Sequence, residues 1–174
     1  MQGTLSISDT TELDGLEGLE ALESCDRLAL QNNADLDDVS SLKALFWAND
    51  IVVTDNAELE SLEGFDRVAS VGTLVLEGNG FYTTAGLENL REVGRLSVVG
   101  NPRLISLAGL NHLRVAADVV IAKNPRLSAY YGLLPALERQ PLRVAVEQNR
   151  GLSREESARL LKPRTTNVAS LSAR

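Results

Sequence analysis

One nine-residue pattern, Leu-x-Leu-x-x-Asn-x-x-Leu, returns along almost the whole chain and constrains its fold more than any other feature. Its first position is held by an apolar residue at successive spacings of 23, 23, 23, 22, 23 and 25, through Leu5, Leu28, Ile51, Leu74, Leu96, Val119 and Val144. Five residues later an asparagine follows in six of the seven copies, with Thr10 in its place in the first: Asn33, Asn56, Asn79, Asn101, Asn124 and Asn149. A period held this closely predicts a solenoid, in which each repeat is one coil.

The two halves of a repeat have different apolar periods. Within residues 96–99 apolar residues alternate with others, which predicts a short strand with Leu96 and Val98 facing inward. After Asn101 the apolar spacing becomes three, through Leu104, Leu107, Leu110 and Leu113, which favours a loop or helical turn. Stacked coils would place their strands in one parallel sheet. We therefore expect a right-handed single-sheet β-solenoid of about seven coils of 22–25 residues.

The repeated asparagine has a physical reason to recur. Where the strand turns inward, backbone N–H and C=O groups need partners, and the asparagine amide can both donate and accept hydrogen bonds. Stacked copies can also bond to one another. A preference for turns would explain one or two such residues, but not six in register. The sequence therefore predicts an asparagine ladder along the solenoid.

The chain resembles a known family, the bacterial, disulfide-free form of the receptor L-domain leucine-rich solenoid. The resemblance depends on two apolar-x-apolar-x-x-Asn-Pro-Arg-Leu stretches at 96–104 and 119–127, on Leu-Glu-Gly-Leu at 16–19 and Leu-Ala-Gly-Leu at 107–110, and on glycines at 18, 64, 109 and 132. It covers about 150 of the 174 residues. Ordinary leucine-rich repeats have one residue fewer after the asparagine. The resemblance implies recognition of proteins at a cell surface or envelope, whereas the sequence itself leaves the compartment open.

The end of the chain departs from the repeat. Ser153 and Glu156 have the spacing of a capping box, which predicts a short helix at 154–162 that closes the solenoid. The domain would then cover residues 3–162, with a polar tail at 163–174. Because the chain begins inside a repeat, we expect the domain to belong to a longer protein.

Charge is distributed unevenly along the chain. The net charge is −7; residues 1–66 contain 16 Asp and Glu against 2 Lys and Arg, and residues 67–174 contain 8 against 15. The two parts therefore carry −14 and +7. Columns of acidic residues, such as Glu12, Asp35 and Glu58, would stack at about 5 Å, which favours a solvated acidic edge over a cation site. The arginines of the second part lack interleaved aromatic residues, and nucleic acid is not an expected partner.

Residues suited to catalysis are scarce. His112 has no nucleophile beside it in the sequence, Cys25 falls in a column of small apolar residues, and the outward strand column consists of Ser6, Ala29, Val52, Val75, Ser97, Val120 and Ala145. Such a column offers no carboxylate or base. We expect no enzymatic activity, no catalytic residue, no metal and no cofactor. No run of 18 apolar residues occurs, so membrane insertion is not expected.

Aromatic residues interrupt columns that are otherwise polar. Phe81 aligns by counting with Glu58 and Arg103, and Tyr131 aligns with Glu63 and Ala108, so both are expected at the surface; Phe46 and Trp47 also align with polar residues. Exposed aromatics are candidate anchors for a partner. They could equally shield irregular coils.

Two functions from different classes follow from these patterns. The first is a protein-binding module that uses the outward sheet face, with these candidate contact residues: Val52, Thr54, Val75, Glu77, Phe81, Ser97, Val99, Val120 and Tyr131. The second is structural self-association, in which the acidic N-terminal end of one solenoid meets the basic C-terminal end of another.

Overall fold

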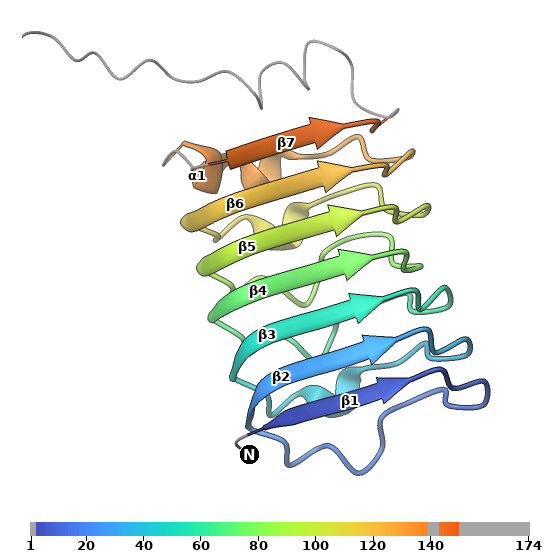
Figure 1. Cartoon of the computed structure of the whole chain (residues 1–174). Helices are drawn as coiled ribbons and strands as arrows, with labels where there is room; N and C mark the ends of the chain where they lie inside the picture. Colours follow the sequence, from blue (N-terminus) through green and yellow to red (C-terminus); the bar gives the residue numbers. More distant parts are fainter. Residues whose placement is uncertain (1–2, 139–142, 150–174) are drawn as a thin grey trace, which may run out of the picture.

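Seven parallel strands form one sheet in sequence order, from β1 to β7 (Figure 1). The structure is a computed structural model that describes residues 3–138 and 143–149. The strands are β1 (Thr4–Ser8), β2 (Ser24–Gln31), β3 (Trp47–Thr54), β4 (Ser70–Glu77), β5 (Glu92–Val99), β6 (Val115–Ala122) and β7 (Arg143–Glu147). Short helical turns lie on the return paths: η1 (Ser40–Leu42), η2 (Ala108–Leu110), η3 (Tyr131–Leu133) and α1 (Leu134–Leu137).

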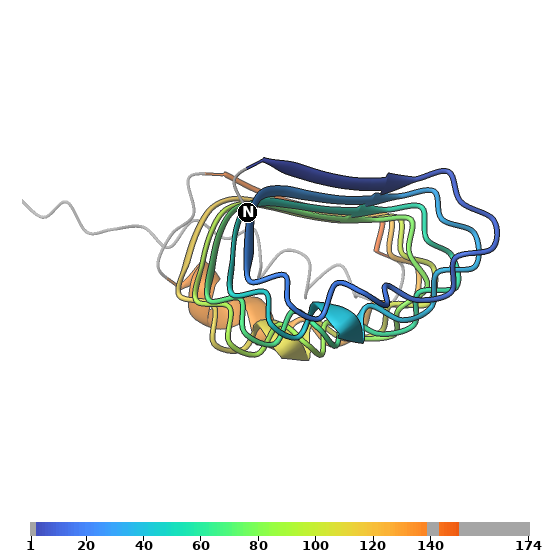
Figure 2. The ribbon, with the colours of Figure 1, turned by 90° about the horizontal axis from the view of Figure 1, so that it is seen from below.

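The chain winds as a right-handed β-solenoid, as the repeat predicts. All strands run in one direction on the near side in Figure 1, and the chain returns behind them while it advances from β1 towards β7. Figure 2 shows the sheet along one side of the coils and the η turns along the other. Each strand pairs with its equivalent one repeat later, as Leu28 does with Ile51 and Leu74 with Leu96. The 22-residue repeat therefore causes no slip in the sheet.

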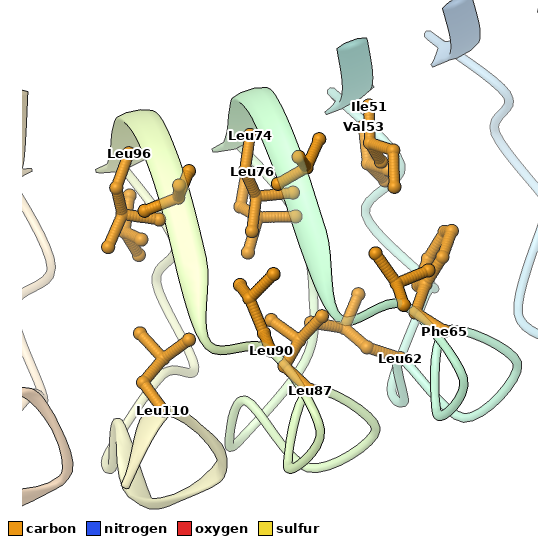
Figure 3. Close-up of a cluster of buried hydrophobic side chains, with 14 of the residues drawn as sticks. Ile51, Val53, Leu62, Phe65, Leu74, Leu76, Leu87, Leu90, Leu96 and Leu110 are labelled. Atoms are coloured by element: carbon orange, nitrogen blue, oxygen red, sulfur yellow. The ribbon is translucent and has the colours of Figure 1, made fainter. Parts of the chain in front are cut away.

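The core is an aliphatic column enclosed by the coils. Strand residues such as Leu74 and Leu76 face return-path residues such as Leu87 and Leu90 (Figure 3), and all four are buried. Burial of one such leucine is worth about 1.5–3 kcal/mol relative to exposure. The equivalent residue of each neighbouring coil packs above and below. No coil can bury its apolar residues alone, so the stack is the stable unit.

The asparagine ladder is present and continuous. In each pair the Oδ1 atom of one asparagine accepts a hydrogen bond from the backbone N–H of the preceding one: Asn33 to Asn56 (3.1 Å), Asn56 to Asn79 (3.2 Å), Asn79 to Asn101 (2.9 Å), Asn101 to Asn124 (3.0 Å) and Asn124 to Asn149 (3.0 Å). The Nδ2 atom donates to a strand carbonyl of the preceding coil, as from Asn79 to Val53 (2.8 Å). Thr10 continues the ladder in the first coil, where its hydroxyl donates to Asn33 Oδ1 at 2.9 Å. Each asparagine from Asn33 to Asn124 thus connects three consecutive coils.

The shortened fourth coil differs from the prediction at one residue. Phe81, expected at the surface, is fully buried, whereas Tyr82 is 40% exposed. The hydrogen bond from the N–H of Ile105 to the carbonyl of Tyr82 (2.8 Å) aligns Tyr82 with Ile105, and hence Phe81 with the buried Leu104. The missing residue therefore lies between Asn79 and Phe81. Counting forward from the asparagine assigned these two aromatics to positions one residue too early in the coil, because the missing residue precedes them.

The described C-terminal helical element is η3 with α1, spanning residues 131–137. Pro135 stands in the first turn of α1, where its missing N–H costs no intrahelical bond. The helix predicted at 154–162 and the polar tail at 163–174 lie outside the described residues.

Candidate interaction surfaces

The outward face of the sheet consists of three columns of side chains. Strand pairing aligns the first column as Thr4, Arg27, Asp50, Thr73, Arg95, Asp118 and Arg143. The central column is Ser6, Ala29, Val52, Val75, Ser97, Val120 and Ala145, and the third is Ser8, Gln31, Thr54, Glu77, Val99, Ala122 and Glu147. Because neighbouring strands lie about 4.8 Å apart, the columns form a regular, closely spaced array.

The sheet brings the seven predicted strand residues onto this face, but it does not expose them equally. Val52 and Ser97 are only 7% and 5% exposed, while Val75 and Val120 are half-buried. Val99 belongs to the third column, beside Glu77, and Ser97 separates Val75 from Val120 in the central one. The apolar part of this face, formed by Val52, Val75, Val99 and Val120, is therefore interrupted and shallow. In the two flanking columns, Arg95, Arg143 and Glu147 are exposed.

Polar contacts hold several side chains of this face in place. The Ser97 hydroxyl donates to Glu77 Oε1 at 2.7 Å, which places the Glu77 carboxylate over the central column. Arg27 lies 3.7 Å from the Asp50 carboxylate in the next strand, and Gln31 Nε2 donates to Thr54 Oγ1 at 3.4 Å. These bonds restrict the rotamers of the face, which reduces the entropy lost when a partner binds.

The remaining predicted aromatics lie away from the sheet face. Tyr131 is 62% exposed, as expected, and belongs to η3 on the return side. Phe46 and Trp47 are also exposed, at the edge where β3 begins. Phe81 lies in the core, as described above, and cannot contact a partner. The structure thus brings no aromatic anchor of the predicted set next to Val75 and Glu77.

A second surface lies where the strands end. The sequence predicts its acidic columns as a solvated edge, but not as an interaction surface. We call this surface the turn edge and define it by the second and fourth residues after each ladder position; in the shortened coil only the fourth position is present, and it is held by Tyr82. In coils 1–3 both positions are acidic and exposed: Glu12, Asp14, Asp35, Asp37, Glu58 and Glu60. From the shortened coil onward they are Tyr82, Arg103, Ile105, Arg126 and Ser128. The signal was present in the sequence as a column that changes from Glu and Asp to Arg.

Arg103 spans the boundary between the two parts of the turn edge. Its guanidinium lies 3.1 Å from Glu60 Oε1, two coils away, and 6.0 Å from the centre of the Tyr82 ring. Coil 4, which lies between Arg103 and Glu60, lacks a residue at the position equivalent to Arg103. The Arg103 side chain is therefore held by both an ion pair and a cation–π contact.

Other acidic residues accept hydrogen bonds from backbone N–H groups of the return loops. Glu20 accepts bonds from the N–H of Gly18 at 3.0 and 3.1 Å, and bonds from its own and the Gly18 backbone N–H hold the pKa of this carboxyl below its usual value. Asp66 and Glu88 accept in the same way from Gly64 (2.8 Å) and Gly86 (2.9 Å). These carboxylates fix the return loop and differ from the acidic residues of the turn edge.

Cys25 and His112 are the side chains of types best suited to catalysis, and each has a structural environment here. Cys25 is fully buried in β2, and burial raises the pKa of its thiol. His112 is exposed on the return side, with Nδ1 at 2.7 Å from the carbonyl oxygen of Glu88, so that Nδ1 carries the proton in this contact. Among the described residues no cluster of three or more His, Cys, Asp or Glu side chains is arranged to hold a metal ion.

Comparison with protein-family models, with curated proteins and with solved structures finds no match for this chain. Within the described part, no helix has the length and apolar character that crossing a membrane requires.

Proposed function

We propose that this chain is a non-enzymatic protein-recognition module of the receptor L-domain type, which binds a protein partner through the outward face of its sheet. The observation that carries this proposal is the face itself, in which seven in-register strands hold three columns of side chains on a rigid stack of coils. Solenoids commonly use such extended surfaces for partners. By the family resemblance, the partner would be met at a cell surface or envelope.

The contacts are expected to centre on β3, β4 and β5. There the half-buried Val75 and Val99 offer apolar area, and Thr54 and Glu77 offer polar groups beside them. Thr73 and the exposed Arg95 of the first column complete the same patch. An apolar centre with a polar rim is the usual arrangement of an interface.

The test compares partners captured from cells by three forms of the chain. The double variant Val75→Asp with Glu77→Arg changes the sheet face, and Arg67→Glu changes an exposed charge on the return side as a matched control. All three must show the same circular dichroism spectrum. We expect the partner to be retained by wild type and Arg67→Glu and lost with the double variant; a partner set that is the same for all three forms would disprove the role of this face.

Head-to-tail association is less well supported by the residues described. Residues 1–66 keep their full charge of −14, but residues 67–138 and 143–149 contain 8 Lys and Arg against 6 Asp and Glu, or +2. Most of the basic surplus therefore belongs to residues outside the described part. Head-to-tail association would be supported by filaments that form at low salt and dissociate as the salt concentration is raised.

A further inference from the structure

The turn edge is self-complementary about the fourth coil. On one side of the coil it carries the exposed carboxylates of Asp35 and Glu58, and on the other the guanidinium groups of Arg103 and Arg126. A two-fold axis perpendicular to the solenoid at coil 4 would place coil 5 opposite coil 3 of a second molecule, and coil 6 opposite coil 2. An interface of this kind pairs each residue twice, since both molecules use the same surface.

We propose that the turn edge binds a second copy of this chain, in an antiparallel two-fold dimer whose axis passes through the column of Asp35, Glu58, Arg103 and Arg126 at the level of coil 4. Arg126 then faces Asp35 of the other copy, and Arg103 faces Glu58. Tyr82 lies in the neighbouring column, beside the axis. The exposed Ile105 adds apolar area next to the axis.

Backbone hydrogen bonds keep the charges of the turn edge evenly spaced. The N–H of Asp37 donates to the Asp14 carbonyl at 3.0 Å in the acidic part. In the other part the N–H of Ile105 donates to Tyr82 at 2.8 Å, and that of Ser128 to Ile105 at 3.1 Å. Both parts therefore rise by about 4.8 Å per coil, and positive groups of one copy stay in register with negative groups of the other.

The charges needed for pairing are accessible. Asp35, Glu58 and Arg126 are exposed, and the ion pairs of the described residues do not involve them. Arg103 already holds Glu60 at 3.1 Å and can contact Glu58 of the second copy with its remaining guanidinium N–H groups. Exposed ion pairs contribute little each, so the dimer should be weak and sensitive to salt. The outward sheet face takes no part, and failure of this proposal would leave the proposed recognition function untouched.

Sedimentation velocity on the whole chain at low salt tests the proposal. We expect a monomer–dimer equilibrium in the micromolar range that shifts to monomer as salt is raised. Arg126→Glu and Asp35→Arg should each weaken the dimer about tenfold or more, because each change affects two pairs, and combining them should restore it. Arg67→Glu, the same charge change away from the turn edge, should have no effect.

Cross-linking gives an independent readout of the geometry. Asp35→Cys combined with Arg126→Cys should form disulfide-linked dimers when the thiols are oxidised by copper–phenanthroline, because each residue faces the other in the second copy, while Ser70→Cys, exposed at the start of β4, should not. The buried native Cys25 contributes little background. The proposal is overturned by a chain that is monomeric under all these conditions, by a dimer indifferent to Arg126→Glu, or by cross-linking at Ser70 instead of between positions 35 and 126.

Discussion

At the scale of single residues, Thr84 is the clearest local defect of the core. It occupies a column otherwise filled by Val39, Leu62 and Leu107, and it is fully buried. Its hydroxyl is the one buried side-chain oxygen or nitrogen of the described residues that has no hydrogen-bond partner. A buried polar group without a partner costs about 1–3 kcal/mol.

Replacing this hydroxyl by a methyl group should therefore stabilise the protein. Thr84→Val is expected to raise the free energy of unfolding by about 1 kcal/mol, measured by urea denaturation. Thr83→Val is the control, because the neighbouring Thr83 Oγ1 accepts a bond from the N–H of Ala85 at 3.2 Å and should lose it. If Thr84→Val destabilised the chain as Thr83→Val does, the hydroxyl would have a partner in solution.

Residues that recur in every coil could be predicted from the sequence, and residues at irregular positions could not. Six asparagines in register require a common partner geometry, and the ladder has it. Phe81 and Tyr82 show the limit: spacing reveals that coil 4 lacks a residue, but not where, and either aromatic can fill a leucine column. The exposure of each side chain on the sheet face could not be predicted from the sequence either, because the burial of Val52 depends on the conformations of neighbouring side chains.

At the scale of one coil, the return path requires glycine where it passes the preceding coil. A Cβ atom at Gly109 would collide with the carbonyl oxygen of Thr84, and one at Gly132 with that of Leu107. At Gly100, in contrast, φ is +67° and a Cβ atom would meet no other atom within 4 Å. The two kinds of glycine are thus needed for different reasons, close packing in one case and a left-handed backbone in the other.

Alanine substitutions should separate these two reasons. Gly100→Ala should cost about 1–2 kcal/mol, the strain of a left-handed alanine. Gly109→Ala should cost clearly more, because its methyl group would force two coils apart and disturb the leucines between them. Thermal unfolding of both variants provides the measurement, and equal losses would mean that the coils can separate locally without penalty.

At the scale of the whole molecule, the solenoid is a one-dimensional stack in which each coil contacts its neighbours. Its free energy of unfolding is then close to a sum of terms for single coils and for the interfaces between them. The effect of a destabilising substitution therefore depends on its position along the stack. Asn79 stands in the middle: it accepts from the N–H of Asn56 and donates to the carbonyl of Val53. Asn33 makes the equivalent contacts near the N-terminal end, with Thr10 and Ile7.

The same substitution should therefore have different consequences at these two places. Asn79→Ala leaves two buried backbone groups without partners, at a cost of roughly 2–5 kcal/mol, and it weakens the coupling between coils 1–3 and coils 4–7. We expect its urea transition to broaden or divide into two. Asn33→Ala should mainly detach the first coil, which amide hydrogen exchange would show as lost protection in Thr4–Ser8 with little change in β5. Loss of protection along the whole sheet in both variants would instead mean that the seven coils unfold as one cooperative unit, and that the ladder acts on all of them together.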